Sequence, residues 1–359
     1  MTKLSTTILL TILALGVVLQ RSQFVSMADK LNKMNLTWTA GLSPDIDYED
    51  EGNLKRRLGA ILTFVPPPRD DKADITTTDG NDNTNTPTNA DSSAKNSTTP
   101  SRPRQLQTTV YPESLDLRLK YPKCRSITLV RNQSQCGSCW AFASMNSLSD
   151  RYCIAKSTAT VTNQKFFSVQ DVLECCQTCN GGSGNGCYGG MPYYAFLYAQ
   201  QTGVVSGETL SYNGFCKPYY LEVKMSYNMT APQCSSICTN PKGFYPTYQL
   251  DKTKIRGVTY GSGEAQMIAA LNNGGSIAVA FMVYQDFYAY RSGIYSHVTG
   301  SALGGHAVRL VGYGVENGVK YWILANSWGS YWGENGFFRM KRGTNDCGIE
   351  SNYFAAGLV

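Results

Sequence analysis

The apolar and polar positions along the chain change character several times, beginning with an apolar run at the start. The run extends from Ile8 to Leu19 and is interrupted by Thr11. It is too short to span a bilayer, and no later stretch is long enough to do so. We therefore expect residues 1–28 to form a secretory signal peptide, and we expect no membrane anchor.

Three further stretches follow the apolar run. Residues 29–65 are polar and have too few apolar positions for a core of their own. Residues 66–109 are dominated by Thr, Asn, Asp, Ser and Pro with no hydrophobic period, which is typical of a low-complexity linker. Residues 110–359 have a globular composition and are expected to form the folded domain.

Within the globular stretch, helical signals come first and strand signals follow. Ser138, Ser168 and Met191-Pro192 are predicted to begin helices, the first two as N-caps and the third through a proline in the first turn. Runs of β-branched and aromatic residues predict strands at Ile277–Val283, His306–Tyr313, Tyr321–Leu324 and Phe337–Met340. This order indicates an α+β fold with two lobes and a substrate cleft between them.

Composition and charge narrow the function classes. The formal net charge of +6 falls on residues 111–359, without a run of Lys and Arg, so we expect no nucleic-acid partner. The 12 cysteines indicate a disulfide framework made in the secretory pathway.

A candidate nucleophile lies at the first predicted helix start. Cys139 follows Ser138 and precedes the apolar or small residues of a helical face, so its thiol is near the positive end of the helix dipole. That position favours the thiolate, the form that attacks carbonyls. The alternative is that Cys136 and Cys139 form a redox-active or metal-binding C-x-x-C pair.

The chain has only two histidines, and they are the candidates for a general base. His306 follows two glycines at the start of a predicted strand and is the expected base, whereas His297 is expected to be structural. Asn326 is the candidate to orient the imidazole through its side-chain oxygen. Trp328 would shield that hydrogen bond from water.

The order Cys139, His306, Asn326 and the sequence Cys-Gly-Ser-Cys-Trp resemble the papain family of cysteine peptidases, and within it cathepsin B. The resemblance covers residues 110–359, and more loosely 29–65. It implies a papain-like fold with a helical N-terminal lobe and a β-barrel-like C-terminal lobe. Its other markers are Asp150–Ile154, Cys175-Cys176, Phe244–Tyr248, Val279–Phe281, Gly312–Gly318 and Cys347–Ser351.

The resemblance also implies roles for single residues. Gln133 and the Cys139 backbone N–H would form the oxyanion hole. Gly189 and Gly190 would offer backbone hydrogen bonds to an extended substrate. Trp328 would contribute to the substrate site. The second subsite would be lined by Ala280, Ala307 and Asn352.

The disulfide pattern is implied by the same resemblance. It pairs Cys124–Cys153, Cys136–Cys187, Cys175–Cys234, Cys176–Cys179 and Cys216–Cys238, and leaves Cys347 free. A zinc site at Cys175, Cys176, Cys179 and Cys187 is the competing interpretation. We expect no cofactor and no metal.

Residues 29–65 resemble the short cathepsin B prosegment, which blocks the cleft. The resemblance thus predicts a zymogen, with its own propeptide as inhibitor and protein or peptide substrates. We expect a monomer, located in a lysosome or endosome-like compartment or outside the cell.

Two departures from cathepsin B affect the expected specificity. The stretch from Cys216 to Cys234 contains no histidine to grip a substrate's C-terminal carboxylate, and Lys217 and Lys224 are the only cations there. Asn352 stands where cathepsin B has a glutamate. We therefore expect an endopeptidase; the alternatives are a peptidyl-dipeptidase or a non-catalytic secreted binding protein on the same fold.

Four Asn-x-Ser/Thr sequons predict a glycoprotein; they begin at Asn35, Asn96, Asn132 and Asn228. A glycan at Asn132 would crowd Gln133, so we expect that site to be bare. Asn228 is the expected site of glycosylation on the mature domain.

Overall fold

The computed structural model describes residues 20–44, 46, 48, 51–64, 110–156, 164–182, 185–208, 214–220, 230–240 and 247–357. The predicted signal run, the whole of the predicted linker, and the sequons at Asn96 and Asn228 lie outside these residues. The chain divides into two compact units, Met1–Thr63 with Tyr111–Val359, and Phe64–Val110. The fold described here is that of the first unit.

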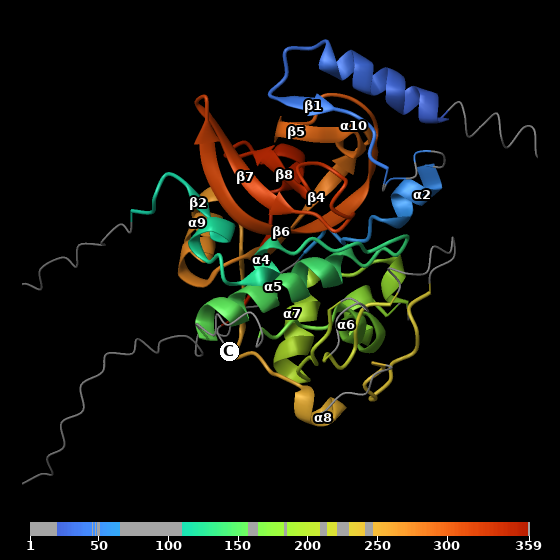
Figure 1. Ribbon diagram of the computed structural model, residues 1–359, viewed down its shortest axis with the longest axis vertical. Coiled ribbons are helices and arrows are strands. Elements are labelled where there is room, and N and C mark those ends of the chain that lie inside the picture. The colour runs from blue at the N-terminus through green and yellow to red at the C-terminus, as the bar shows by residue number, and fades with distance from the viewer. Residues whose placement is uncertain are drawn as a thin grey trace, which may run out of the picture. The chain divides into compact units, whose positions relative to one another are not determined.

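Helices are concentrated in the first half of the globular stretch that begins at residue 110 (Figure 1). The α-helices are α2 (Glu51–Arg56), α3 (Leu117–Lys120), α4 (Arg125–Thr128), α5 (Cys139–Lys156), α6 (Val169–Cys175), α7 (Pro192–Gln201), α8 (Tyr248–Asp251), α9 (Glu264–Gly274) and α10 (Gln285–Tyr288). Short 3-10 helices are η1 (Gln177–Asn180), η2 (Gly186–Tyr188) and η3 (Asp346–Gly348). Residues 20–32 are also helical.

The strands form one mixed sheet. They are β1 (Trp38–Ala40), β2 (Leu115–Asp116), β3 (Val258–Gly261), β4 (Ile277–Tyr284), β5 (Tyr290–Tyr295), β6 (Ala302–Glu316), β7 (Val319–Ala325), β8 (Phe337–Lys341) and β9 (Tyr353–Ala356). Their order is β1-β5-β8-β7-β6-β4-β9-β3, with β2 paired to β6. Only β5 and β8 pair in parallel among the described strands.

The α+β prediction is confirmed, and all four predicted strands are present. The strands follow an open path, and no pairing between described residues closes it into a barrel. Two of the predicted helix starts are also confirmed. The Ser168 hydroxyl accepts from the Asp171 N–H at 2.9 Å, and Pro192 opens α7.

The structure corrects the capping role expected for Ser138. Ser138 does precede α5, and its carbonyl accepts from the N–H groups of Ala141 and Phe142. Its hydroxyl, however, contacts the Cys136 carbonyl at 3.4 Å and the Tyr219 hydroxyl at 3.2 Å. The side chain is therefore used to join two loops, and it does not cap the helix.

Helix α5 is the centre of the domain, between the sheet and helices α6 and α7 (Figure 1). It is buried on all sides along most of its length, which explains why its sequence lacks a polar face. Arg309 of β6 donates to both Asp150 carboxylate oxygens at 2.9 Å. Arg151 donates to the Ala356 carbonyl at 2.8 Å, so the end of α5 is joined to two strands.

The described residues between 20 and 64 pack against the sheet and share its core. Phe24, Leu31, Trp38 and Leu54 are buried in the same hydrophobic cluster as the sheet. Strand β1 pairs with β5, which places the predicted prosegment at one end of the sheet. Because residues 20–32 form one helix, a signal cleavage at residue 28 would divide a packed element, and the cleavage site stays a prediction.

All five disulfides implied by the resemblance are present, and Cys139 and Cys347 are the free cysteines. Cys136 bonds to Cys187, so it is not available for a redox pair with Cys139. The four cysteines of the zinc alternative are all in disulfides. Within the described ranges there is no cluster suited to a metal ion, and no helix is long and apolar enough to cross a membrane.

Candidate active site

The candidate nucleophile, Cys139, is the first residue of α5 and is completely buried. Its sulfur accepts a hydrogen bond from the Ala307 backbone N–H at 3.5 Å. Ala307 lies in β6 directly after His306. Cys139 and His306, the two predicted catalytic residues, are thus brought together by the start of α5 and by strand β6.

Two contacts hold the His306 imidazole, one at its Nε2 atom and one over the face of its ring. Its Nε2 is 2.8 Å from the Asn326 Oδ1, as the sequence predicts. The Trp328 ring stacks on the imidazole with centroids 4.7 Å apart, and Trp328 is completely buried. The Nδ1 atom is buried and has no hydrogen-bond partner within the described part of the chain, so it is the nitrogen left to exchange a proton with the thiol.

Gln133 is positioned on a loop before α5. Its Oε1 accepts from the Ser327 hydroxyl at 2.6 Å, which leaves Nε2 as the donor. That nitrogen donates to the Cys136 carbonyl at 2.7 Å and to the carbonyl of Arg57 in the prosegment at 2.9 Å. A peptide carbonyl is therefore bound to the Gln133 amide, one of the two donors predicted for the oxyanion hole.

The prosegment backbone continues along the predicted substrate site in extended form. The Gly190 N–H donates to the Gly59 carbonyl at 2.7 Å, and the Gly190 carbonyl accepts from the Ile61 N–H at 3.1 Å. On the other side, the Ala60 N–H donates to the Gly305 carbonyl at 3.0 Å. Ala60 and Gly190 form a parallel bridge, so Gly190 binds an extended chain, while Gly189 lies close to the Gly59 carbonyl.

The close approach of the two backbones requires glycine at two positions. A Cβ on Gly59 would lie 2.0 Å from the Gly137 carbonyl oxygen, a contact that no side chain can make. Gly189 has a φ of +113°, in the region that favours glycine, and a Cβ there would lie 2.9 Å from the Gly59 carbonyl.

Burial, with the prosegment backbone against the site, shifts the pKa values of both reacting groups toward their neutral forms. It raises the pKa of the Cys139 thiol to about 11, although the N–H groups of Ala307 and Gly59 oppose this. It lowers the pKa of His306 to about 4; Asn326 opposes the shift and the nearby charge of Arg57 adds to it. In this covered form desolvation outweighs the helix terminus, and the acidic thiol expected for the open enzyme stays a prediction.

The three residues predicted for the second subsite lie on neighbouring strands. Ala280 of β4 is opposite Ala307 of β6. Asn352 directly precedes β9, whose Tyr353 pairs with Val279. The antiparallel register therefore places Asn352 beside Ala280.

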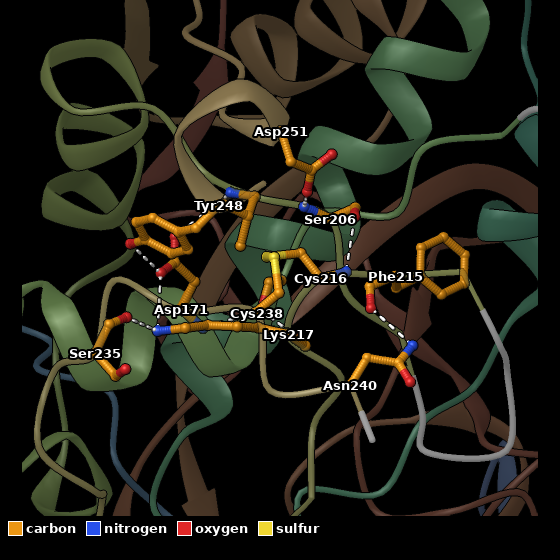
Figure 2. The surroundings of a disulfide bond; sticks show 12 residues. Asp171, Ser206, Phe215, Cys216, Lys217, Ser235, Cys238, Asn240, Tyr248 and Asp251 are labelled. Carbon is orange, nitrogen blue, oxygen red and sulfur yellow. Dashed lines mark hydrogen bonds and ion pairs between the residues drawn. A yellow bond between two sulfur atoms is a disulfide. The ribbon is translucent and has the colours of Figure 1, made fainter. Parts of the chain in front are cut away.

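Lys217 is not available to grip a substrate carboxylate, contrary to one option left open by the sequence. It is completely buried, and its ammonium is 2.9 Å from Glu174 and 3.4 Å from Asp171. Figure 2 shows it beside the Cys216–Cys238 disulfide, where it also donates to the Ser235 carbonyl. The other cation considered, Lys224, lies outside the described residues.

His297 has the structural position expected for it. Its ring stacks on Tyr284 with centroids 3.7 Å apart, and its Nδ1 is 3.2 Å from both oxygens of the Asp286 carboxylate. Of the two described sequons, Asn35 is exposed, while the Asn132 Oδ1 accepts from the Ser134 N–H at 2.8 Å.

Sequence reasoning missed the residues of the prosegment that touch the site. Arg57 and Gly59 fall in the stretch from Leu54 to Gly59, which stands out only by its charge and its final glycine. That glycine was the available signal. Tyr219, whose hydroxyl bonds to the Gln133 carbonyl, had no signal because its role depends on a contact across 86 residues.

Comparison with known proteins decides the family. A family model described as papain family cysteine protease matches residues 111–356. The chain belongs to the papain family.

Among its relatives, this papain-family chain is 43% identical over 253 residues to cathepsin B-like cysteine proteinase 4 of Caenorhabditis elegans, covering 67% of this chain and 73% of the relative. A cathepsin B-like cysteine proteinase of Schistosoma japonicum is 39% identical, covering 69% and 73%. The solved structure of proCathepsin B S9 from Trypanosoma congolense superposes with a TM-score of 0.68 at 29% identity, covering 92% of this chain and 97% of that one.

These findings agree with the geometry of the site. The papain-family chain is a cysteine peptidase, similar to cathepsin B, and it is made as a zymogen. The resemblance drawn from the sequence is thereby confirmed.

Replacing Gly59 with alanine should loosen the prosegment. The added methyl would overlap the Gly137 carbonyl oxygen, and overpacking of this kind costs about 1–3 kcal/mol. The ratio of precursor with the prosegment bound to precursor with it released should therefore fall roughly 5- to 150-fold. The measurement is the rate at which a small thiol reagent labels Cys139 in the full-length precursor carrying Cys347→Ser. Gly257→Ala is the matched control, since its Cβ would enter open space. Equal labelling of both variants would contradict the placement of Gly59.

Proposed function

We propose that the chain is a cathepsin B-like endopeptidase that hydrolyses peptide bonds through Cys139, His306, Asn326 and Gln133. The observation that carries the proposal is the Arg57 carbonyl bound to the Gln133 Nε2 at 2.9 Å. This carbonyl is a stand-in for a scissile carbonyl, held at the loop that leads into the nucleophile's helix. Once the prosegment has left, a substrate carbonyl takes its place.

In the proposed reaction, the Cys139 thiolate attacks the scissile carbonyl carbon while the imidazole of His306 carries the thiol's proton. The Gln133 Nε2 and the Cys139 backbone N–H donate to the oxygen as it becomes negative. His306 then protonates the leaving amine through Nδ1, and a thioester to Cys139 remains. A water molecule, deprotonated by His306, attacks the thioester and releases the acid and the thiol.

Asn326 and Trp328 act on His306 in this scheme. The 2.8 Å contact between the Asn326 Oδ1 and Nε2 fixes the ring and supports the proton on that nitrogen, so that Nδ1 faces the reaction. The neutral amide does this without adding a negative charge beside the imidazole. The stacked Trp328 ring keeps water from the hydrogen bond.

The remaining features concern where a substrate binds. Gly189 and Gly190 would hold an extended substrate as Gly190 now holds residues 59–61. Ala280, Ala307 and Asn352 would line the second subsite. The burial of Lys217 supports an endopeptidase, because an exopeptidase needs a cation within reach of the substrate's C-terminal carboxylate.

We further propose that the enzyme passes through the secretory pathway to a lysosome or endosome-like compartment or to the outside of the cell. It would act there as a monomer, without a cofactor. Residues 1–28, 29–65 and 66–109 would be the signal peptide, propeptide and linker.

The nucleophile is tested by a pair of matched variants. Cys139→Ser should abolish peptide hydrolysis, whereas Cys347→Ser should retain it, because these are the two cysteines outside the disulfides. Turnover of a fluorogenic peptide by each processed enzyme is the measurement. Activity that persists in Cys139→Ser would exclude the proposed nucleophile.

The second subsite is tested at Asn352. Its neutral side chain should favour hydrophobic residues over arginine two positions before the scissile bond. Asn352→Glu should raise the relative kcat/KM for arginine roughly tenfold or more, because a charged hydrogen bond is worth about 1.5–3 kcal/mol. Asn352→Gln is the control of equal length without charge, and it should leave the preference unchanged. An equal gain in both variants would show that length, and not charge, sets the preference.

Endopeptidase activity is tested with two peptides that share one cleavage sequence. One ends with a free carboxylate two residues past the cut, and the other is longer and amidated. We expect the longer peptide to be cleaved at least as fast. Much faster cleavage of the free-carboxylate peptide would support a peptidyl-dipeptidase instead.

A further inference from the structure

Tyr219 is a completely buried residue beside the site that has no part in the chemistry proposed above. Its ring meets Phe142 of α5 edge-on, with centroids 4.7 Å apart. The Arg131 guanidinium lies over the same ring, 5.9 Å from its centroid. The phenol is thus fixed between the nucleophile's helix and the loop that carries Gln133.

The Tyr219 hydroxyl connects the two parts of this region. It donates to the Gln133 backbone carbonyl at 2.9 Å and lies 3.2 Å from the Ser138 hydroxyl. A phenol has one proton to donate, so with that proton on Gln133 it can only accept from the Ser138 hydroxyl, whose own proton is shared with the Cys136 carbonyl. One oxygen atom therefore contacts both the oxyanion-hole loop and the residue before Cys139.

The peptide unit that Tyr219 holds is the one that sets the direction of the Gln133 loop. Ser134, which follows Gln133, has a φ of +57°, an unfavourable value for a residue other than glycine. The Gln133–Ser134 peptide is bound at both ends, its carbonyl by Tyr219 and its N–H by the Asn132 Oδ1 at 2.8 Å. Such a conformation persists only where surrounding contacts enforce it.

We infer that Tyr219 is a positioning residue, whose hydroxyl holds the Gln133 backbone so that the Gln133 amide points into the oxyanion hole. This inference rests on the role proposed for Gln133. Without the hydroxyl, the Gln133 carbonyl is left buried without this donor, and the strained turn at Ser134 is free to relax. A small displacement of Nε2 then weakens the hydrogen bond to the transition state.

The segment that carries Tyr219 is itself anchored close by. The Cys216–Cys238 disulfide fixes it on one side, and Lys217 binds Asp171 and Glu174 of α6 (Figure 2). The disulfide and the ion pairs hold the segment of Tyr219 in place, and none of their residues belongs to the proposed catalytic set. The stretch that differs from cathepsin B therefore begins with a support for the oxyanion hole.

The test is Tyr219→Phe in the processed enzyme, which removes the hydroxyl and keeps the ring. We expect kcat to fall about tenfold to a hundredfold with KM little changed, a part of the loss that follows removal of an oxyanion-hole donor. Alkylation of Cys139 by iodoacetamide develops no oxyanion, so its rate should be unchanged. Tyr313→Phe is the matched control. It removes another buried phenol hydroxyl, bonded to the Pro112 carbonyl at 3.0 Å, and should leave kcat unaltered.

Gln133→Ala separates the inference from the proposal beneath it. If Tyr219 acts through Gln133, the double variant Gln133→Ala/Tyr219→Phe should be no slower than Gln133→Ala alone. An undiminished kcat in Gln133→Ala would overturn the oxyanion role itself. A normal kcat in Tyr219→Phe, additive losses in the double variant, or a parallel loss of alkylation rate would each overturn the positioning role while leaving that of Gln133 intact.

Discussion

The hydrogen bonds between the prosegment backbone and the catalytic groups are the interaction on which the precursor depends. Arg57 binds Gln133, and Gly59 and Ile61 bind Gly190. They are backbone contacts made in extended form, so they require little of the prosegment sequence except glycine at residue 59. These contacts affect the chemistry because they accompany the exclusion of water from the site. Cys139 and His306 are completely buried, so neither the thiolate nor the imidazolium is stabilised by solvent.

Removal of the prosegment would let Cys139 and His306 become charged without a net uptake of protons near neutral pH. A thiol with a neutral imidazole and a thiolate with an imidazolium contain the same number of protons. In the proposed mechanism, departure of the prosegment would let one proton move from Cys139 to His306 as water and the helix terminus stabilise the charges. Inhibition and activation would then differ in the solvation of these two groups.

The buried Asp150–Arg309 pair joins α5 to β6 under the site. Ser276 donates to Asp150 and Arg309 donates to the Ser126 carbonyl, and losing either partner of the pair would leave a buried charge. Because Cys139 begins α5 and His306 lies within β6, this contact also fixes their relation. The disulfides Cys124–Cys153 and Cys136–Cys187 hold both ends of the same helix region.

Much of the site could be predicted because its signals are local. Cys139, His306 and Asn326 each lie in a short recognisable stretch, and β4, β6, β7 and β8 have clear runs of strand-forming residues. Strand β1 was missed because three residues give no period, and it forms through pairing with β5. Arg57 and Tyr219 could not be found for a related reason, since each acts on Gln133 from far along the chain. The depressed pKa of His306 and raised pKa of Cys139 depend on burial, which the sequence does not show.

NMR of the histidine rings shows whether the prosegment holds the proposed catalytic pair in its neutral form. With only two histidines in the chain, His297→Asn leaves the His306 ring as the single signal. In the unprocessed chain, the account predicts a neutral His306 that becomes protonated only as the pH approaches about 4. In the processed enzyme it predicts an imidazolium near neutral pH. An imidazolium in the unprocessed chain near neutral pH would contradict the account.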